Sequence, residues 1–388
     1  MFEIFSYLPT KIVFGVGKVD ELPKFVKGLG KKALIVTGRK STKASGLLDR
    51  VIQHLSAAGI ESVVFDKITP NPILETVDEG AEVAIKERID LIIGLGGGSA
   101  IDSAKAISIA AYNGGSYWDY TRVGKSLKAK GAYPIIAIPT THGTGAEADP
   151  FMVITNTKTK EKLGQGFGDL TFPKVSIVDP ETMKTLPPNQ TVYTSMDAFY
   201  HSLEAFININ ANPYSDVLAI DSMKRVVSYL RVAYENGEDL EARTQLAWAS
   251  TEAGITETIT GVVANHALEH GLSGFNEKVV HGLGLCTLGP TFLEYIFDHA
   301  FKKIAVFGRE VFGILEYDDK KAAYIAIKKL WEFQEVFKCN IPIRKLDISK
   351  EDFEEMAEIV YGMFKELAEV TPGKLTKEDF VKIYEKAY

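Results

Sequence analysis

The chain has 388 residues, of which 46% are hydrophobic and 24% charged, a composition typical of a soluble globular enzyme and a length sufficient for two domains. Its net charge of −7 gives no reason to expect a nucleic acid partner, and no apolar stretch approaches the ~20 residues that span a bilayer. The first fifteen residues lack the layout of a signal peptide, and two cysteines cannot form a disulfide framework, so we expect a cytoplasmic protein that binds no membrane.

The first half of the chain alternates short apolar strands with helical patterns. Strands are predicted at residues 33–36, 62–65, 91–93 and 135–138, and helices at 47–58, 73–87 and 103–111. Alternation at this spacing is typical of a parallel sheet covered by helices on both faces. We therefore predict an α/β domain that is a candidate for nucleotide binding.

The second half is predicted to be almost entirely helical. Its helical patterns cover residues 193–208, 215–235, 240–259 and 320–337, and capping boxes at Ser349–Asp352 and Thr376–Asp379 each predict the start of a further helix. We place the boundary after Pro187, which gives an α/β domain of residues 1–187 and a helical domain of residues 188–388.

A glycine-rich turn, Gly-Leu-Gly-Gly-Gly-Ser-Ala-Ile-Asp from Gly94 to Asp102, follows the third predicted strand. Glycines let the backbone approach a pyrophosphate, and the helix N-terminus offers free N–H groups. A tight turn alone needs only one or two glycines, so this turn predicts a nucleotide site, although its spacing is neither GxGxxG nor that of a Walker loop. The threonine-rich loop 139–147 would lie at the same edge of the sheet, but it is equally compatible with a plain turn.

Four of the seven histidines fall between residues 201 and 281. Asp197 and His201 are four residues apart in a helical pattern and therefore share a face, and His266 and His270 repeat this spacing. One such pair is more often structural, but two pairs followed by His281 favour a site for a divalent first-row metal. The spacing does not indicate which three histidines would be ligands. His54 and His299 are interpreted as structural.

These motifs resemble, in order and over nearly the whole length, the iron-containing (group III) alcohol dehydrogenase family. The matching segments are Ile12–Gly17 with Leu22-Pro23, Pro70–Pro72, Gly96–Asp102, Pro139–Glu147, Asp197-Ala198…His201…Glu204, His266-Ala267…His270 and His281-Gly282. The resemblance implies a dehydroquinate synthase-like fold. In that fold an α/β dinucleotide-binding (Rossmann-like) domain precedes an all-α domain, with the active site in the cleft between them.

The resemblance also implies the site residues. The metal, Fe²⁺ with Zn²⁺ as a substitute, would be held by Asp197, His201, His266 and His281, and His270 would be a catalytic residue near the nicotinamide and the substrate. The cofactor pyrophosphate would lie on Gly97, Gly98 and Ser99, and the other cofactor contacts would be Gly38, Ser41, Asn71, Asp102, Thr140, Thr141, Thr144 and Lys162.

The implied activity is that of an NAD(P)-dependent alcohol dehydrogenase of the EC 1.1.1 class. Hydride would pass between NAD(P) and a small primary alcohol or aldehyde, with the substrate alkoxide bound to the metal. The loop Gly38-Arg39-Lys40-Ser41 carries two cations and no acid, so we expect NADP or NAD with a slight preference for NADP. Family members are often dimers or larger assemblies, and the alternating N-terminal segment could pair across a subunit edge, so we expect a homodimer.

Some residues depart from the family pattern. Ser195 replaces a common glycine, and His142 and Asp149–Phe151 are unusual at positions that the resemblance places near the nicotinamide, so cofactor geometry or substrate preference could shift. Glycerol dehydrogenase-like polyol oxidation and a dehydroquinate synthase-like lyase remain alternatives. Aromatic and aliphatic residues around the predicted metal site favour a small alcohol, whereas the lyase requires a cluster of cations. A nucleotide-binding protein without catalysis is a third alternative.

Overall fold

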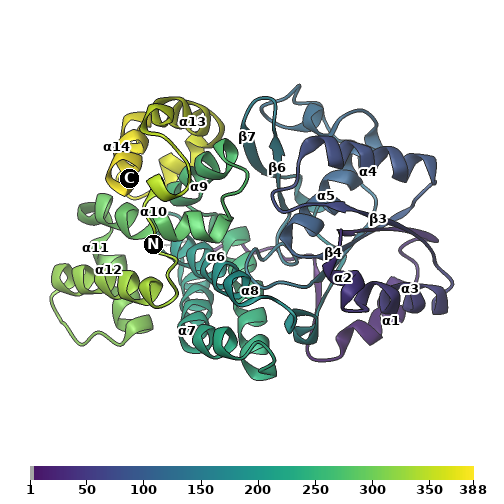
Figure 1. The fold of residues 1–388 in the computed structure, drawn as a ribbon, viewed down its shortest axis with the longest axis horizontal. Helices are drawn as coiled ribbons and strands as arrows, with labels where there is room; N and C mark the ends of the chain where they lie inside the picture. Colours follow the sequence, from purple (N-terminus) through teal and green to yellow (C-terminus); the bar gives the residue numbers. More distant parts are fainter. Residues whose placement is uncertain (1–3) are drawn as a thin grey trace.

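The computed structural model describes residues 4–388 and has an α/β half and a helical half side by side (Figure 1). The α/β half contains a six-stranded parallel sheet with the strand order β1-β8-β5-β4-β2-β3. The strands are β1 (Lys11–Phe14), β2 (Lys32–Gly38), β3 (Glu61–Ile68), β4 (Leu91–Gly96), β5 (Ile135–Pro139) and β8 (Val175–Val178). The predicted parallel sheet is therefore present.

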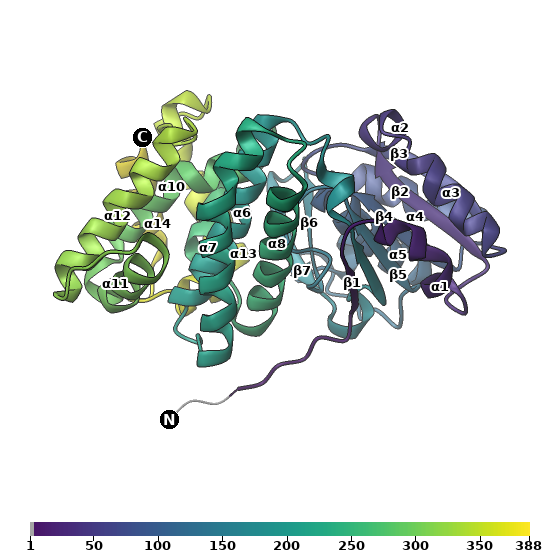
Figure 2. The same ribbon diagram turned by 90° about the horizontal axis from the view of Figure 1, so that it is seen from below.

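Helices cover both faces of this sheet (Figure 2). Ala33 and Ile35 of β2 pack with α1 (Leu22–Val26) and α3 (Leu47–Ala57), whereas Leu34 and Val36 pack with α4 (Leu74–Lys86) and α5 (Gly98–Asn113). Successive strand residues point to opposite faces, and both faces are apolar here, which explains the continuous hydrophobic runs in the sequence.

The sequence analysis missed four strands. Two of them, β6 (Phe151–Asn156) and β7 (Glu161–Gly166), form a separate antiparallel hairpin whose second strand is polar and rich in glycine. The short strands β1 and β8 pair with each other in parallel. The apolar side chains of Ile12, Val13 and Phe14 pack inside this chain, and β1 is an edge strand of the sheet, so pairing of the N-terminal segment across a subunit edge stays a prediction. Residues 1–3 of that segment lie outside the described residues.

The helical half follows β8 and, within the described residues, contains no strand. Its α-helices are α6 (Pro188–Ile207), α7 (Pro213–Glu235), α8 (Leu240–Thr260), α9 (Ala264–Phe275), α10 (His281–Tyr295), α11 (Phe297–Phe312), α12 (Asp319–Val336), α13 (Phe353–Val370) and α14 (Lys377–Ala387). Both predicted capping boxes are present, at Ser349–Asp352 and Thr376–Asp379. Helix α6 begins at Pro188, while the division into domains at this residue stays a prediction.

Helix α6 lies at the centre of this half, in contact with α7, α8 and α10. Every residue from Ser195 to Ile207 is buried. The helix therefore carries its polar side chains into the interior, where each needs a partner. No helix among residues 4–388 is both long enough and apolar enough to cross a membrane.

The backbones of the two halves come into close contact at a pair of glycines. A Cβ atom at Gly254 of α8 would lie 2.3 Å from the carbonyl oxygen of Gly145, in the loop after β5. The hydroxyl of Ser250 accepts the backbone N–H of Gly143 at 2.7 Å and that of Gly145 at 3.3 Å. The loop 139–147 is thus fixed on α8, and only glycine allows this approach.

We expect Gly254→Ala to destabilise the protein by about 1–3 kcal/mol, because the new methyl group would collide with a backbone carbonyl that cannot rotate away. The matched control is Gly362→Ala in α13, where an added Cβ meets no atom within 4 Å and alanine has the higher helix propensity. Thermal unfolding monitored by circular dichroism compares the two variants. Equal melting temperatures would show that the close approach does not constrain the fold.

Candidate metal centre

Three polar side chains of α6 lie on one buried helix face: Asp197, His201 and Glu204. Their spacings of four and three residues place them one above another. His266 and His270 occupy one face of α9, and His281 is the first residue of α10. The site is therefore built where α6 meets the beginnings of α9 and α10.

The structure brings together all four predicted metal ligands. The Asp197 Oδ1 atom lies 3.3 Å from His201 Nδ1, 3.9 Å from His266 Nε2 and 3.5 Å from His281 Nε2. One donor atom from each of Asp197, His201 and His266 lies within 4.8 Å of the other two. The geometry suits a shared cation, while the assignment of the ligands stays a prediction.

All four histidines use Nδ1 in a hydrogen bond. The acceptors are the Asp197 carbonyl for His201 (3.0 Å), Glu204 Oε1 for His266 (2.7 Å), the Lys162 carbonyl for His270 (3.0 Å) and Glu269 Oε2 for His281. Carbonyl and carboxylate oxygens only accept, so each Nδ1 carries the proton. Each Nε2 atom is therefore available as an acceptor or metal ligand. Metal-binding histidines in proteins are commonly oriented in this way, by a hydrogen bond from the other ring nitrogen.

The residues present fit a divalent cation. Among the described residues, the buried atoms Asp197 Oδ1 and His266 Nε2 have no hydrogen-bond partner. Burial would raise the pKa of Asp197, but the neighbouring imidazoles lower it to about 2, so its carboxylate is charged. Burial lowers the pKa of His201 to about 4 and that of His281 well below its usual range. A carboxylate and neutral imidazoles are the protonation states that metal ligands require.

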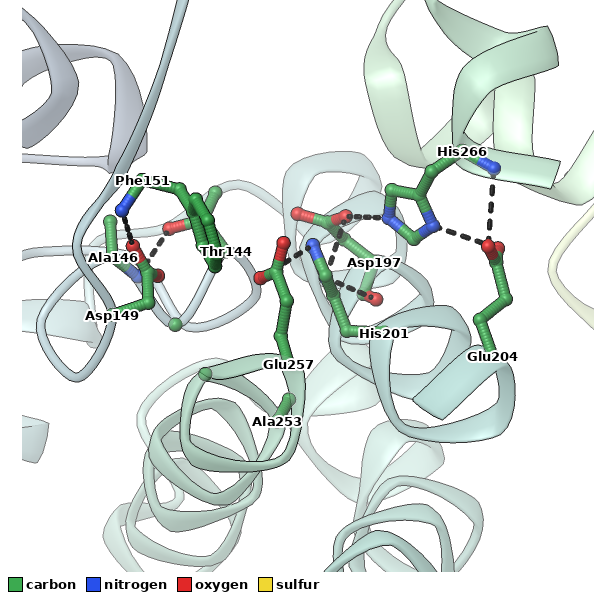
Figure 3. A network of polar contacts seen from close by, with 12 residues as sticks. Thr144, Ala146, Asp149, Phe151, Asp197, His201, Glu204, Ala253, Glu257 and His266 are labelled. Atoms are coloured by element: carbon green, nitrogen blue, oxygen red, sulfur yellow. Dashed lines mark hydrogen bonds and ion pairs between the residues drawn. The ribbon is translucent and has the colours of Figure 1, made fainter. Parts of the chain in front are cut away.

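His266 differs from the other histidines. Burial would lower its pKa, but the carboxylates of Glu204 and Asp197 raise the pKa to about 10. Glu204 holds this histidine at two points, since its Oε2 atom also accepts the backbone N–H of His266 at 3.2 Å (Figure 3). Without a metal, His266 is therefore an imidazolium, and metal binding at Nε2 would release its proton.

A cavity of about 460 Å³ extends from the glycine-rich turn to the histidine cluster, between the two halves. The predicted site residues that line it are Asn71, Gly98, Ser99, Asp102, Thr144 and Lys162 from the first half and Asp197, His201, His266, His270 and His281 from the second. The predicted residues that do not line it are Gly38, Ser41, Gly97, Thr140 and Thr141.

The glycine-rich turn connects β4 to α5, with Gly97 as the N-cap of α5. A Cβ atom at Gly98 would lie 2.4 Å from the methyl group of Thr144, and one at Gly97 would lie 3.1 Å from the side chain of Thr141. The glycines therefore also admit the threonine loop, a packing role that the sequence analysis did not foresee. Gly38 ends β2, the strand that pairs with β4 beside this turn, and Ser41 begins the short helix α2 (Ser41–Ala44).

Asn71 and Lys162 both have partners within the protein. The Asn71 amide donates to the carbonyls of Glu277 (2.9 Å) and Val279 (3.3 Å) and so connects the two halves. The buried Lys162 ammonium donates to the Ser273 hydroxyl at 2.8 Å and lies 3.5 Å from Glu269. Their cofactor contacts therefore stay predictions.

Three acidic residues near the site received no role from the sequence. Glu204 and Glu269 accept from His266 and His281, two of the predicted ligands. Glu257 of α8 has its Oε2 atom 3.5 Å from His201 Nε2 (Figure 3). Burial beside Asp149 raises the pKa of Glu257 well above its usual range. Glu204 was part of a recognised motif, whereas no spacing pattern connected Glu257 to the histidines.

His142 and Ser195, which both depart from the family pattern, lie within hydrogen-bond distance of each other. His142 is buried outside the cavity lining, and its Nε2 atom lies 2.9 Å from the Ser195 hydroxyl. His142 therefore pairs with a residue of α6, and an effect on cofactor geometry or substrate preference stays a prediction. Asp149 and Phe151 do line the cavity, and Asp149 pairs with the buried Lys105 ammonium at 3.0 Å.

The chain matches two family models, "Iron-containing alcohol dehydrogenase" over residues 9–180 and "Fe-containing alcohol dehydrogenase family, C-terminal" over residues 191–388. It is 34% identical to NADH-dependent butanol dehydrogenase A of Clostridium acetobutylicum, with 99% of each chain covered, and 34% identical to NAD-dependent methanol dehydrogenase of Bacillus methanolicus, with 98% and 99% covered.

Among solved structures, an archaeal halo-thermophilic alcohol dehydrogenase from a Red Sea brine pool superimposes with a TM-score of 0.96, at 33% identity over 100% of both chains. The predicted fold class and the prediction of an alcohol dehydrogenase of the EC 1.1.1 class are thereby confirmed. The chain belongs to the iron-containing alcohol dehydrogenase family.

Proposed function

We propose that this enzyme holds a divalent metal ion with Asp197, His201, His266 and His281 and transfers hydride between NAD(P) and a small primary alcohol or aldehyde. One observation carries the proposal. At one end of the interdomain cavity, three histidines each donate a hydrogen bond from Nδ1 to an oxygen atom, which leaves Nε2 for a metal, and the Asp197 Oδ1 atom near them has no hydrogen-bond partner. The other end of the cavity is the glycine-rich turn at the N-terminus of α5.

The metal ion, when bound, would lower the pKa of an alcohol hydroxyl and polarise a carbonyl group. Fe²⁺ is the expected metal, and Zn²⁺ could supply the same chemistry. Gly98 and Ser99 would position the cofactor pyrophosphate on the first turn of α5. The nicotinamide, which would accept or supply the hydride, would then lie at the histidine end of the cavity.

His270 is proposed as the catalytic residue that holds or relays the substrate proton. Its Nδ1 donates to the Lys162 carbonyl, so Nε2 is an acceptor on the cavity side. Burial lowers the pKa of His270 well below its usual range, so the ring is neutral and its Nε2 lone pair can accept a hydrogen bond from a substrate hydroxyl.

The lining of the cavity favours a small uncharged substrate. Phe151, Val153, Val262, Phe364 and Leu367 supply apolar surface near the histidines. The lining cations Arg122 and Lys162 each have carboxylate and carbonyl or hydroxyl partners already. A phosphate-bearing substrate would need free cations there, which argues against the lyase alternative.

The cofactor proposal concerns the loop after β2. Arg39 and Lys40 are exposed and form no ion pair among the described residues, so both could meet a 2′-phosphate. The names of the two curated relatives specify NADH or NAD, which gives no support to a preference for NADP. We therefore propose that the enzyme uses NAD and also accepts NADP. The homodimer and the cytoplasmic location stay predictions.

Removal of metal with a chelator is expected to abolish NAD(P)H-dependent reduction of butanal, and Fe²⁺ or Zn²⁺ should restore it. The protein is purified without oxygen, and its metal content is measured before and after chelation. Full turnover by metal-free protein would overturn the proposed metal centre. Restored metal content without turnover of any aldehyde or alcohol would leave the site intact but overturn the proposed reaction.

His270→Ala should lower kcat at least about 100-fold, the usual contribution of a general acid or base. The bound metal per subunit should stay unchanged, because His270 is not among the proposed ligands. Steady-state kinetics and metal analysis on the same sample separate the two effects. Unchanged kcat would remove His270 from the mechanism.

The double substitution Arg39→Ala and Lys40→Ala should raise KM for NADP about tenfold or more and leave KM for NAD nearly unchanged, since hydrogen bonds to a charged group are worth about 1.5–3 kcal/mol. Lys43→Ala is the matched control, because this neighbouring lysine already pairs with Asp66. A parallel change in KM for both cofactors would show that the loop does not contact the 2′-phosphate.

A further inference from the structure

Helix α13 is interrupted where it faces the cavity. Phe364 has φ −128° and ψ 34°, which is not helical, although the helix continues on both sides. Kinks of this kind occur where an outside group takes over a backbone carbonyl of the helix. Here the outside group belongs to the other half of the molecule.

That group is the guanidinium of Arg122, which follows the short helix η2 (Tyr117–Tyr120). Its Nε and Nη2 atoms donate to the carbonyl of Met363, the residue just before the kink, at 3.3 Å and 3.0 Å. Its Nη1 atom donates to the carbonyl of Gly164 in β7 at 3.0 Å. One planar fork therefore connects the β6–β7 hairpin to the kinked turn of α13.

Two further contacts orient the same side chain. The guanidinium lies 3.1 Å from the carboxylate of Glu366 and stands over the ring of Phe364, 5.4 Å from its centroid. The Arg122 backbone N–H donates to the Gln165 side chain at 2.9 Å. The side chain is 36% exposed, so this set of contacts forms the rim of the cavity, open to solvent.

Phe364 is held between Arg122 and the proposed catalytic histidine. Its ring is 4% exposed, lines the cavity and meets the His270 ring edge-on, with 5.0 Å between centroids and an angle of 75°. A regular helical conformation at this residue would change the direction of its side chain. The kink therefore determines the position of the Phe364 ring, which bounds the cavity beside His270.

We propose that Arg122 is a positioning residue that fixes the kink in α13 and thereby holds Phe364 as the wall that limits the length of the alcohol or aldehyde chain. The inference rests on the proposed function, since it assigns a substrate limit to the same cavity. Arginine suits this role because its rigid planar fork holds donors toward two carbonyls while its face lies over a ring, whereas an ammonium group has all its donors on one freely rotating atom.

The experiment compares kcat/KM for propanal and hexanal in the wild type, Arg122→Ala, Arg122→Lys, Phe364→Ala and the Arg122→Ala, Phe364→Ala double variant. Both alanine variants should shift the hexanal-to-propanal ratio at least about tenfold toward hexanal, the effect expected when a wall in an apolar pocket is removed. Arg122→Lys should fall between wild type and Arg122→Ala. The double variant should equal Phe364→Ala, because Arg122 acts through that ring.

The matched control is Arg231→Ala, which removes an arginine paired with Glu235 on the exposed side of α7 and should leave the ratio unchanged. A merely structural role for Arg122 would lower kcat/KM for both aldehydes in parallel. That result, or additive shifts in the double variant, would overturn the proposal.

Hydrogen exchange separates this inference from the proposed function. Arg122→Ala should increase amide exchange in residues 363–368 and leave α11 unchanged, since the kinked turn loses its anchor. If the wild type reduces neither aldehyde, the proposed function fails while the exchange result still decides whether Arg122 holds the kink. Unchanged exchange in this segment would overturn the role of Arg122 directly.

Discussion

The burial of the C-terminal part of α6 is the constraint on which the site depends. Since every residue from Ser195 to Ile207 is buried, the polar side chains of Asp197, His201 and Glu204 need partners from neighbouring helices. Glu204 takes four donors from the start of α9, namely the backbone N–H groups of Val263 and His266, the Asn265 side-chain amide and the His266 ring, and so fixes where α9 begins. The same requirement orients His281 at the start of α10, through Glu269. The hydrogen bonds required by the buried polar side chains thus bring the members of the cluster together.

The second constraint is close backbone contact between the halves. The Gly145–Gly254 approach fixes the threonine loop on α8, and Gly97 and Gly98 admit that loop against the turn before α5. The proposed cofactor and metal ends of the cavity therefore share one rigid boundary. Asn71 and Arg122 cross between the halves at other points of the cavity lining, each by donating to backbone carbonyls. The distance between the two ends is set by these few polar and glycine contacts.

Local patterns explain which features were predictable from the sequence. The apolar runs of β2 and β4 and the four-residue spacings within α6 and α9 each depend on a single strand or helix. The structure contains these strands and helices as expected. Strand β7 was missed because Glu161–Gly166 is polar and rich in glycine, with neither clear alternation nor β-branched residues. Strand β6 contains Val153, Ile154 and Thr155 and so has a strand composition, which the sequence analysis overlooked. The partnerships of His266 with Glu204 and of His142 with Ser195 join residues distant in sequence, so only packing defines them. Glu257 was missed for the same reason.

The acidic side chains explain why this cluster suits a cation. Asp197, Glu204, Glu257 and Glu269 surround the histidines, whereas Lys162 is the only lysine or arginine that contacts one of these acids among the described residues. Imidazolium formation at His266 offsets part of the negative charge, but burial opposes it at His201 and His281. A divalent ion would balance the charge without protonating those rings and would connect α6, α9 and α10 at one point. Any ion that binds only the folded chain also stabilises it, so the proposed catalytic metal would act as a structural link between these helices.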